Sequence, residues 1–126
     1  MSTTVLESLA RRARPGERPE ELLLDLGLLD EHAFALEIAS RTGKPFRGLR
    51  GFVPDPRLFV YLPVAIAIRE RVCPLVLIGD SLKLASAFSD PDVSFLERRF
   101  SNLSVEIGIA PRSEILEALN RVTELL

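Results

Sequence analysis

Proline and glycine divide this chain into short segments, and this division constrains the fold more than any other feature of the sequence. Nine prolines and seven glycines are spread over 126 residues. A proline is tolerated in the first turn of a helix but breaks a helix interior, whereas glycine favours helix ends. Helix starts are therefore predicted at Pro19, Pro56, Pro63, Pro91 and Pro111, and helix ends at Gly27 and Gly43.

The composition fits one folded domain. The chain is 47% hydrophobic and 27% charged, and its 16 Lys and Arg face 18 Asp and Glu, for a net charge of -2. A balanced charge provides no general positive field for DNA or RNA. The single cysteine, Cys73, and the single histidine, His32, can form neither an internal disulfide nor a Cys/His zinc site. We expect no nucleic-acid partner and no metal, a buried Cys73 and a surface His32.

Membrane and export signals are missing from the sequence. The longest apolar stretch, residues 58–68, is interrupted by Pro63 and is shorter than the roughly 20 residues that cross a bilayer. The first residues carry their charges after the apolar positions, unlike a secretory signal. We expect a cytoplasmic protein without direct membrane insertion.

The first third of the chain is predicted to be helical. Thr4 and Glu7 form a capping-box pattern at the start of one helix. A second helix runs from Pro19 to Gly27, and a third begins after the N-cap Asp30 and ends at Gly43. We interpret residues 1–43 as a helical subdomain and the Gly-, Pro- and Arg-rich residues 44–55 as a connecting segment.

Residues 56–126 combine helices and strands. A strand-like apolar run at 73–78 and an alternating stretch at 82–87 flank Gly79-Asp80, which predicts a hairpin. A helix from Pro91 and an alternating strand at 105–109 follow, and a last helix begins at Pro111. The link from Leu84 to Val105 is long enough for a crossover between parallel strands. The predicted fold class is α+β or α/β, with a single domain whose helical N-terminal third precedes a sheet of about three strands backed by helices.

No arrangement of reacting groups is visible. The two glycine-rich nucleotide-binding patterns do not occur, and Gly48 to Gly51 has no strand before it. His32 has no Ser or Cys at a recognisable spacing, and Cys73 opens an apolar strand. Paired carboxylates fall at helix starts, where the helix dipole explains them. We expect no catalytic residues, and therefore not an enzyme.

One cluster of positive charge stands out. Arg41, Lys44, Arg47 and Arg50 lie between residues 41 and 53 without a single carboxylate. Two interpretations remain open: a solvated loop, or a surface for an anionic ligand or an acidic partner, for which arginine is well suited.

Several motifs in order resemble the N-terminal domain of the bacterial type II secretion and type IV pilus assembly ATPases, a family that includes cyclic di-GMP-binding members. The most specific is LKLASAFSDPD at 82–92, which follows the predicted hairpin turn. The others are ELLLDLG at 21–27, LLD at 28–30, TGKP at 42–45, LP at 62–63, CPL at 73–75 and SEILEAL at 113–119.

This resemblance implies an adaptor role. The family's domain docks on an inner-membrane assembly platform, or on the attached ATPase, or reads a second messenger. No Walker sequence occurs in this chain, so we interpret it as a non-catalytic docking or regulatory module, free-standing or part of a longer protein. We expect residues 22–38 to present a face to a protein partner, with Leu26 as an anchor and Arg47 and Arg50 on the rim.

The cyclic di-GMP-binding members imply an alternative ligand set, taken from the motif R-L-G-x-x-L-V-x-x-G that ends in a helix with L-x-x-Q. On this sequence the matching positions are Arg18, Leu23, Leu24 and Gly27, with Phe34 and Ile38 at later leucines and Arg41 at the glutamine. Pro19, Glu20 and Arg41 depart from the motif, which has leucine, glycine and glutamine at these positions. A carboxylate beside two phosphates is unfavourable. No tandem copy of the motif is present.

Overall fold

The computed structural model describes residues 19–124. The helix expected from Thr4 and the candidate ligand residue Arg18 lie outside this range. The described elements, in chain order, are α2 Pro19–Asp25, α3 Glu31–Thr42, the 3-10 helix η1 Pro56–Val60, α4 Val64–Glu70, β1 Val72–Ile78, β2 Ser81–Ser86, α5 Phe95–Arg99, β3 Ser104–Ile109 and α6 Arg112–Thr123.

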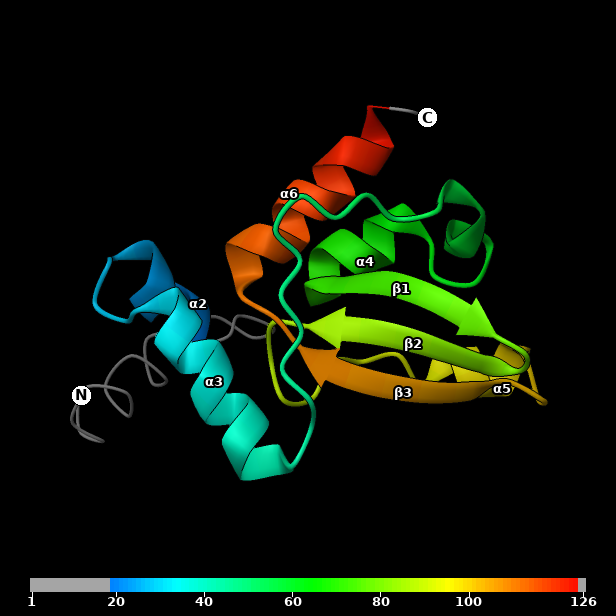
Figure 1. Cartoon of the computed structure of the whole chain (residues 1–126), viewed down its shortest axis with the longest axis horizontal. Helices are drawn as coiled ribbons and strands as arrows, with labels where there is room; N and C mark the ends of the chain where they lie inside the picture. Colours follow the sequence, from blue (N-terminus) through cyan, green and yellow to red (C-terminus); the bar gives the residue numbers. More distant parts are fainter. Residues whose placement is uncertain (1–18, 125–126) are drawn as a thin grey trace.

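The sheet has three strands in the order β1-β2-β3 and is mixed (Figure 1). β1 and β2 are antiparallel and form the predicted hairpin, whose turn contains Gly79 with a φ of 59°. β2 and β3 are parallel, so the chain must cross from one end of the sheet to the other between them, and α5 lies in this crossover. The α+β fold class predicted from the sequence is confirmed.

Pro74 occupies the middle of a strand, a position that proline tolerates only where its missing N–H matters little. β1 is an edge strand, and its pairing with β2 shifts register between Pro74 and Val76. Such a bulge on an edge strand accommodates the proline without breaking the sheet. Cys73, next to it, is fully buried, as expected.

The core lies where α4 and α6 pack against each other and against the sheet (Figure 1). From β2, Leu82 and Leu84 are fully buried. From α6, Ile115, Leu119 and Val122 are buried, and their i, i+4, i+7 spacing places them on one face of the helix.

The prediction of a helix beginning at Pro91 is wrong, because α5 begins at Phe95. The backbone N–H of Asp92 donates to Glu70 Oε1 at 2.8 Å, and the N–H of Val93 donates to the carbonyl of Pro91 at 3.1 Å. These bonds fix residues 90–93 in a non-helical path against the end of α4. The expected helix at Pro56 is present, in 3-10 form and capped by Asp55.

Helices α2 and α3, which we call the front helices, begin and end as predicted. Asp30 Oδ1 accepts a hydrogen bond from the N–H of Ala33 at 2.8 Å, which is the N-cap contact. Gly27 and Gly43 adopt φ values of 70° and 71° at the two helix ends, a backbone conformation that favours glycine.

The segment after α3 pairs with the edge strand β3 through a single parallel bridge between Phe46 and Ile109. The N–H of Arg47 donates to the carbonyl of Ile109 at 2.7 Å, and the N–H of Ile109 donates to the carbonyl of Pro45 at 2.8 Å. Figure 1 shows this segment running from the end of α3 past the end of the sheet. The division of the chain into subdomains at residues 44–55 stays a prediction.

Candidate functional site

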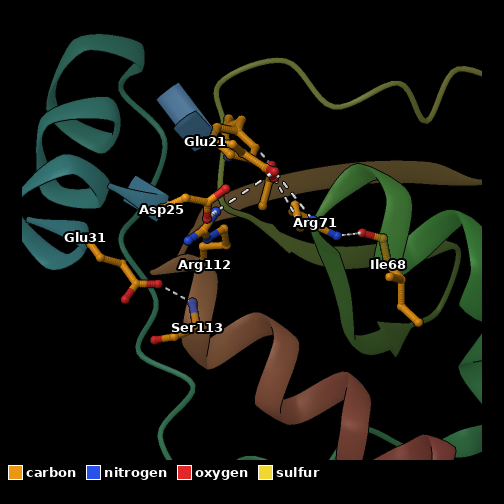
Figure 2. A network of polar contacts seen from close by, with 9 residues as sticks. Glu21, Asp25, Glu31, Ile68, Arg71, Arg112 and Ser113 are labelled. Atoms are coloured by element: carbon orange, nitrogen blue, oxygen red, sulfur yellow. Dashed lines mark hydrogen bonds and ion pairs between the residues drawn. The ribbon is translucent and has the colours of Figure 1, made fainter. Parts of the chain in front are cut away.

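A network of polar contacts holds α2 and α3 against the remainder of the domain (Figure 2). Glu21 Oε1 of α2 accepts from Arg71 Nε at 2.8 Å. Arg112 Nη1 lies 2.9 Å from Asp25 Oδ1 and 3.9 Å from Glu21 Oε2. We call these four residues, together with Glu31, the polar clamp.

Glu31 completes the polar clamp at the start of α6. Its carboxylate accepts from the backbone N–H of Ser113, in the first turn of α6, where backbone donors lack helical partners and the helix dipole favours negative charge. Glu114 of α6 makes a bond in the opposite direction, from the helix to the segment after α3. Its Oε1 accepts from the backbone N–H of Leu49 at 2.7 Å. Carboxylates from α2, α3 and α6 therefore fix the front helices and the segment after them around one helix end.

A cleft of about 470 Å³ lies between the front helices and the loop that follows β2. Its walls come from three places that are distant in sequence: α2, α3 and residues 88–90. The lining residues are Glu20, Leu23, Leu29, Phe34, Ile38, Arg41, Thr42, Phe88, Ser89 and Asp90.

Local contacts shape the loop side of this cleft. The hydroxyl of Ser86 donates to the carbonyl of Phe88 at 2.7 Å and accepts from the N–H of Phe88 at 3.1 Å. The ring of Phe88 meets that of Phe34 edge-on, with centroids 6.2 Å apart. Lys44 Nζ donates to the carbonyl of Ser89 at 2.7 Å, so the loop is attached to the end of α3.

The charges that line the cleft do not add up to a positive site. Two carboxylates, Glu20 and Asp90, face one cation, Arg41. The charge of Arg41 is also partly compensated within α3, because its Nε donates to Glu37 Oε1 at 2.7 Å. Apolar side chains and charges of both signs therefore line the cleft together.

The cleft brings together part of the ligand set predicted from the sequence. Leu23 and Arg41 line it, as do Phe34 and Ile38. Leu24 packs against the core instead, and Gly27 lies in the exposed turn after α2. The loop residues 88–90 were missed, because no local pattern in the sequence places them opposite α3.

The residues predicted to bind a partner are all exposed. Leu26 is 62% exposed, and Leu28 and Leu36 on the same front segment are 60% and 45% exposed. Arg47 and Arg50 are also exposed. Leu26 lies in the turn after α2, whereas both arginines lie in the segment after α3.

The two residues most often used as nucleophile or base lie apart in the fold. Burial in β1 raises the pKa of the Cys73 thiol from 9.0 to about 12, which keeps it protonated. His32 is exposed on α3, where its ring meets that of Phe46 edge-on at 5.3 Å. In the described part of the chain, no three His, Cys, Asp or Glu side chains are grouped to hold a metal ion.

No helix between residues 19 and 124 combines the length and the apolar character needed to cross a bilayer.

A mixed three-stranded sheet packed on helices, with a clamped helical pair and a cleft beside it, defines a small α+β domain. The chain belongs to the MshEN domain family, whose model matches residues 42–125. The resemblance to the N-terminal domains of secretion and pilus ATPases, stated from the sequence motifs, is thereby confirmed.

Solved structures agree with this assignment. The N-terminal domain of XpsE is 26% identical, with a TM-score of 0.67, over 96% of this chain and 85% of that one. MshE with cyclic di-GMP is 26% identical, with a TM-score of 0.62, over 97% of this chain and 90% of that one. A second crystal form of the XpsE domain shares the fold, with 23% identity and a TM-score of 0.72 over 96% and 85% of the two chains. No curated protein sequence matches the chain significantly.

Proposed function

We propose that this chain is a non-catalytic docking and regulatory domain that binds a protein partner through the front face, residues 22–38. The observation that carries this proposal is the exposure of three large aliphatic side chains on that segment, Leu26, Leu28 and Leu36. Burying a leucine side chain contributes about 1.5–3 kcal/mol, so these three are the natural anchors of an interface. The partner we propose is the cytoplasmic part of an inner-membrane assembly-platform protein, or an attached ATPase domain.

The polar clamp supports this function by holding the front face in one orientation. A surface that is ordered before binding loses less conformational entropy when the partner arrives. Arg47 and Arg50 are exposed beyond α3 and would orient an acidic partner surface and raise its association rate.

The test compares binding by the wild type and by a variant that combines Leu26→Asp, Arg47→Glu and Arg50→Glu. Each purified protein is immobilised, and binding of the purified platform segment and of the ATPase domain is measured by interferometry. We expect the variant to bind at least about tenfold more weakly, because one buried leucine alone accounts for that factor. Val60→Asp is the matched control, since Val60 is 67% exposed on η1.

Thermal melting of both variants checks that they remain folded. Equal binding by the triple variant and the wild type would show that the front face is not the docking surface. Failure of the wild type to bind either protein contradicts the docking function itself.

Binding of cyclic di-GMP is a second candidate function. The observation in its favour is that Leu23, Phe34, Ile38 and Arg41, four positions of the family's ligand motif, line one cleft. A relative that is 26% identical, MshE, has been solved with this nucleotide. Glu20 in the same cleft opposes an anionic ligand.

Calorimetric titration and thermal melting with cyclic di-GMP test this candidate. A ligand selective for the native state raises the melting temperature with its concentration. Glu20→Gln removes the opposing charge and should strengthen binding, whereas Arg41→Ala should weaken it. Absence of heat and of any thermal shift in both the wild type and Glu20→Gln eliminates this function.

A further inference from the structure

Three cations from two separate parts of the chain line one groove on the sheet. Lys44 and Arg47 come from the segment after α3, and Lys83 comes from the middle of β2. The groove has a volume of about 310 Å³, and its single carboxylate is Glu106 of β3. In a chain with a net charge of -2, this groove is locally positive. We call it the basic groove.

The pairing of β2 with β3 places the basic groove on the face of the sheet opposite the core. Lys83 is paired with Glu106, and directly paired residues in neighbouring strands point to the same side. The neighbours of Lys83, Leu82 and Leu84, point the other way and are fully buried.

Arg47 is positioned in the groove and is not neutralised there. A Cβ on Gly108 would lie 3.0 Å from the carbonyl oxygen of Pro45 and 3.3 Å from Cγ and Cδ of Arg47. The aliphatic part of Arg47 therefore rests directly on the backbone of β3. Within residues 19–124 its guanidinium makes no hydrogen bond or ion pair, so all of its donors are available.

Neither lysine makes a short hydrogen bond to a carboxylate. Lys83 Nζ lies 3.7 Å from Glu106 Oε2, which is longer than a hydrogen bond. Lys44 Nζ donates to the carbonyl of Ser89, a neutral acceptor. A ligand that carries negative charge would therefore meet three cations that the fold holds near one another.

The backbone around the basic groove argues against a site for a single phosphate. Phosphate sites use converging backbone N–H groups. Here the N–H of Arg47 is bonded to the carbonyl of Ile109, and the N–H of Lys44 lies 3.3 Å from Thr42 Oγ1, its acceptor. These two backbone donors are therefore occupied. The cationic side chains of the groove come from two segments, the one after α3 and β2, an arrangement that suits several carboxylates spaced along a chain. The side chain of Lys83 is only 31% exposed, so a flat membrane surface reaches it poorly.

We infer that the basic groove binds an extended acidic segment of a protein partner, one with two or more Asp or Glu side chains. Arg47 would donate two parallel hydrogen bonds to one carboxylate, in the bidentate geometry that guanidinium favours, and Lys83 would pair with another. This inference rests on the proposed docking function, and it names the chemistry that the partner must present.

The probe is a fluorescein-labelled peptide of four Glu-Ser repeats, compared with a Gln-Ser peptide of the same length. Fluorescence anisotropy is measured at low and at high NaCl concentration. We expect the Glu-Ser peptide alone to bind, and salt to weaken its binding because the charges are partly exposed. Lys83→Gln and Arg47→Gln should each weaken binding about three- to fivefold. Arg98→Gln, which removes an exposed cation in the last turn of α5, should change it less than about twofold.

Equal losses in Lys83→Gln and Arg98→Gln would overturn the inference, because the peptide would then respond only to net charge. Displacement of the peptide by inorganic phosphate at an equal concentration of negative charge would overturn it in favour of a phosphate site. Stronger binding to phosphatidylserine vesicles than to the peptide would overturn it in favour of a membrane surface.

The proposed function and this inference can fail separately. Lys83 lies outside the front face, and a single Leu26→Asp variant leaves Arg47 and the rest of the basic groove unchanged. A partner that binds Lys83→Gln normally but not the single Leu26→Asp variant supports docking and refutes the basic groove. A peptide that binds in the groove, with no binding of either purified partner protein, supports the groove and contradicts the docking function.

Discussion

Replacing Glu21 by glutamine should release the front helices without unfolding the core. Oε1 of Glu21 accepts a hydrogen bond from Arg71 Nε at 2.8 Å, and Oε2 lies 3.9 Å from Arg112 Nη1. Glu21 therefore connects α2 to both arginines of the polar clamp. Glutamine keeps the size of the side chain and removes its charge. The side chains of Glu21 and Arg71 are 21% and 24% exposed, so solvent screens the pair only in part.

The size of the effect follows from these contacts. A hydrogen bond to a charged group contributes about 1.5–3 kcal/mol, and the Arg112 contact is too long to add much. We expect a loss of about 2 kcal/mol, which corresponds to an increase of about 30-fold in the population of open front helices.

Hydrogen exchange followed by mass spectrometry measures this opening. Amides of α2 and α3 should exchange up to about 30-fold faster in Glu21→Gln, while those of β2 and α6 change much less. The matched control is Glu37→Gln, which breaks an exposed pair with Arg41 on α3 and should change exchange about twofold or less.

Two results would refute this reasoning. If α2 and α3 exchange at the same rate in Glu21→Gln and Glu37→Gln, the polar clamp does not hold the front helices. If β2 accelerates as much as α2, the helices do not open separately from the core.

Three further perturbations test the fold and the chemistry. Gly108→Ala should lower the free energy of unfolding by about 1–3 kcal/mol, measured by thermal melting, because the added Cβ would lie 3.0 Å from the carbonyl oxygen of Pro45. Gly48→Ala should be nearly neutral, since its added Cβ would lie 3.9 Å from the nearest atom, Glu114 Oε1. Equal melting temperatures of the two variants would contradict this packing. Cys73, whose thiol has a pKa of about 12 in the folded state against 9.0 ordinarily, should resist iodoacetamide in the folded protein. Because only the thiol of the unfolded chain ionises between these two pKa values, the free energy of unfolding should fall as pH rises from about 9 to 12. A Cys73→Ala variant whose stability shows the same decline argues against this assignment. Asp30→Ala should destabilise α3 by about 1 kcal/mol, measured as lost helical ellipticity on heating, because its cap contact with Ala33 is removed, and unchanged melting would contradict that role.

The sequence predicts best those elements whose signals lie within a few residues. Asp30, Gly27 and Gly43 mark helix ends because a side-chain cap or a positive φ acts on the adjacent backbone. Gly79 defines the hairpin for the same reason. The resemblance that the motifs indicate is confirmed by the family match, which covers residues 42–125.

The helix expected at Pro91 shows where local signals are insufficient. A proline after an aspartate is a good helix start by itself, but the N–H of Asp92 is bonded to Glu70, 22 residues away. The distant bond decides the path of the backbone, and α5 starts later.

The candidate sites depend on the tertiary structure to a larger degree. The sequence by itself determined that Leu23 and Arg41 lie on successive helices, and that Arg47 belongs to a cationic stretch. Only the packed chain places residues 88–90 opposite α3, and only the parallel pairing of β2 with β3 brings Lys83 beside Arg47. The reason is physical: side-chain spacing along a chain fixes which face of a helix or strand a residue occupies, whereas the meeting of two such faces depends on burial and hydrogen bonds summed over the whole fold.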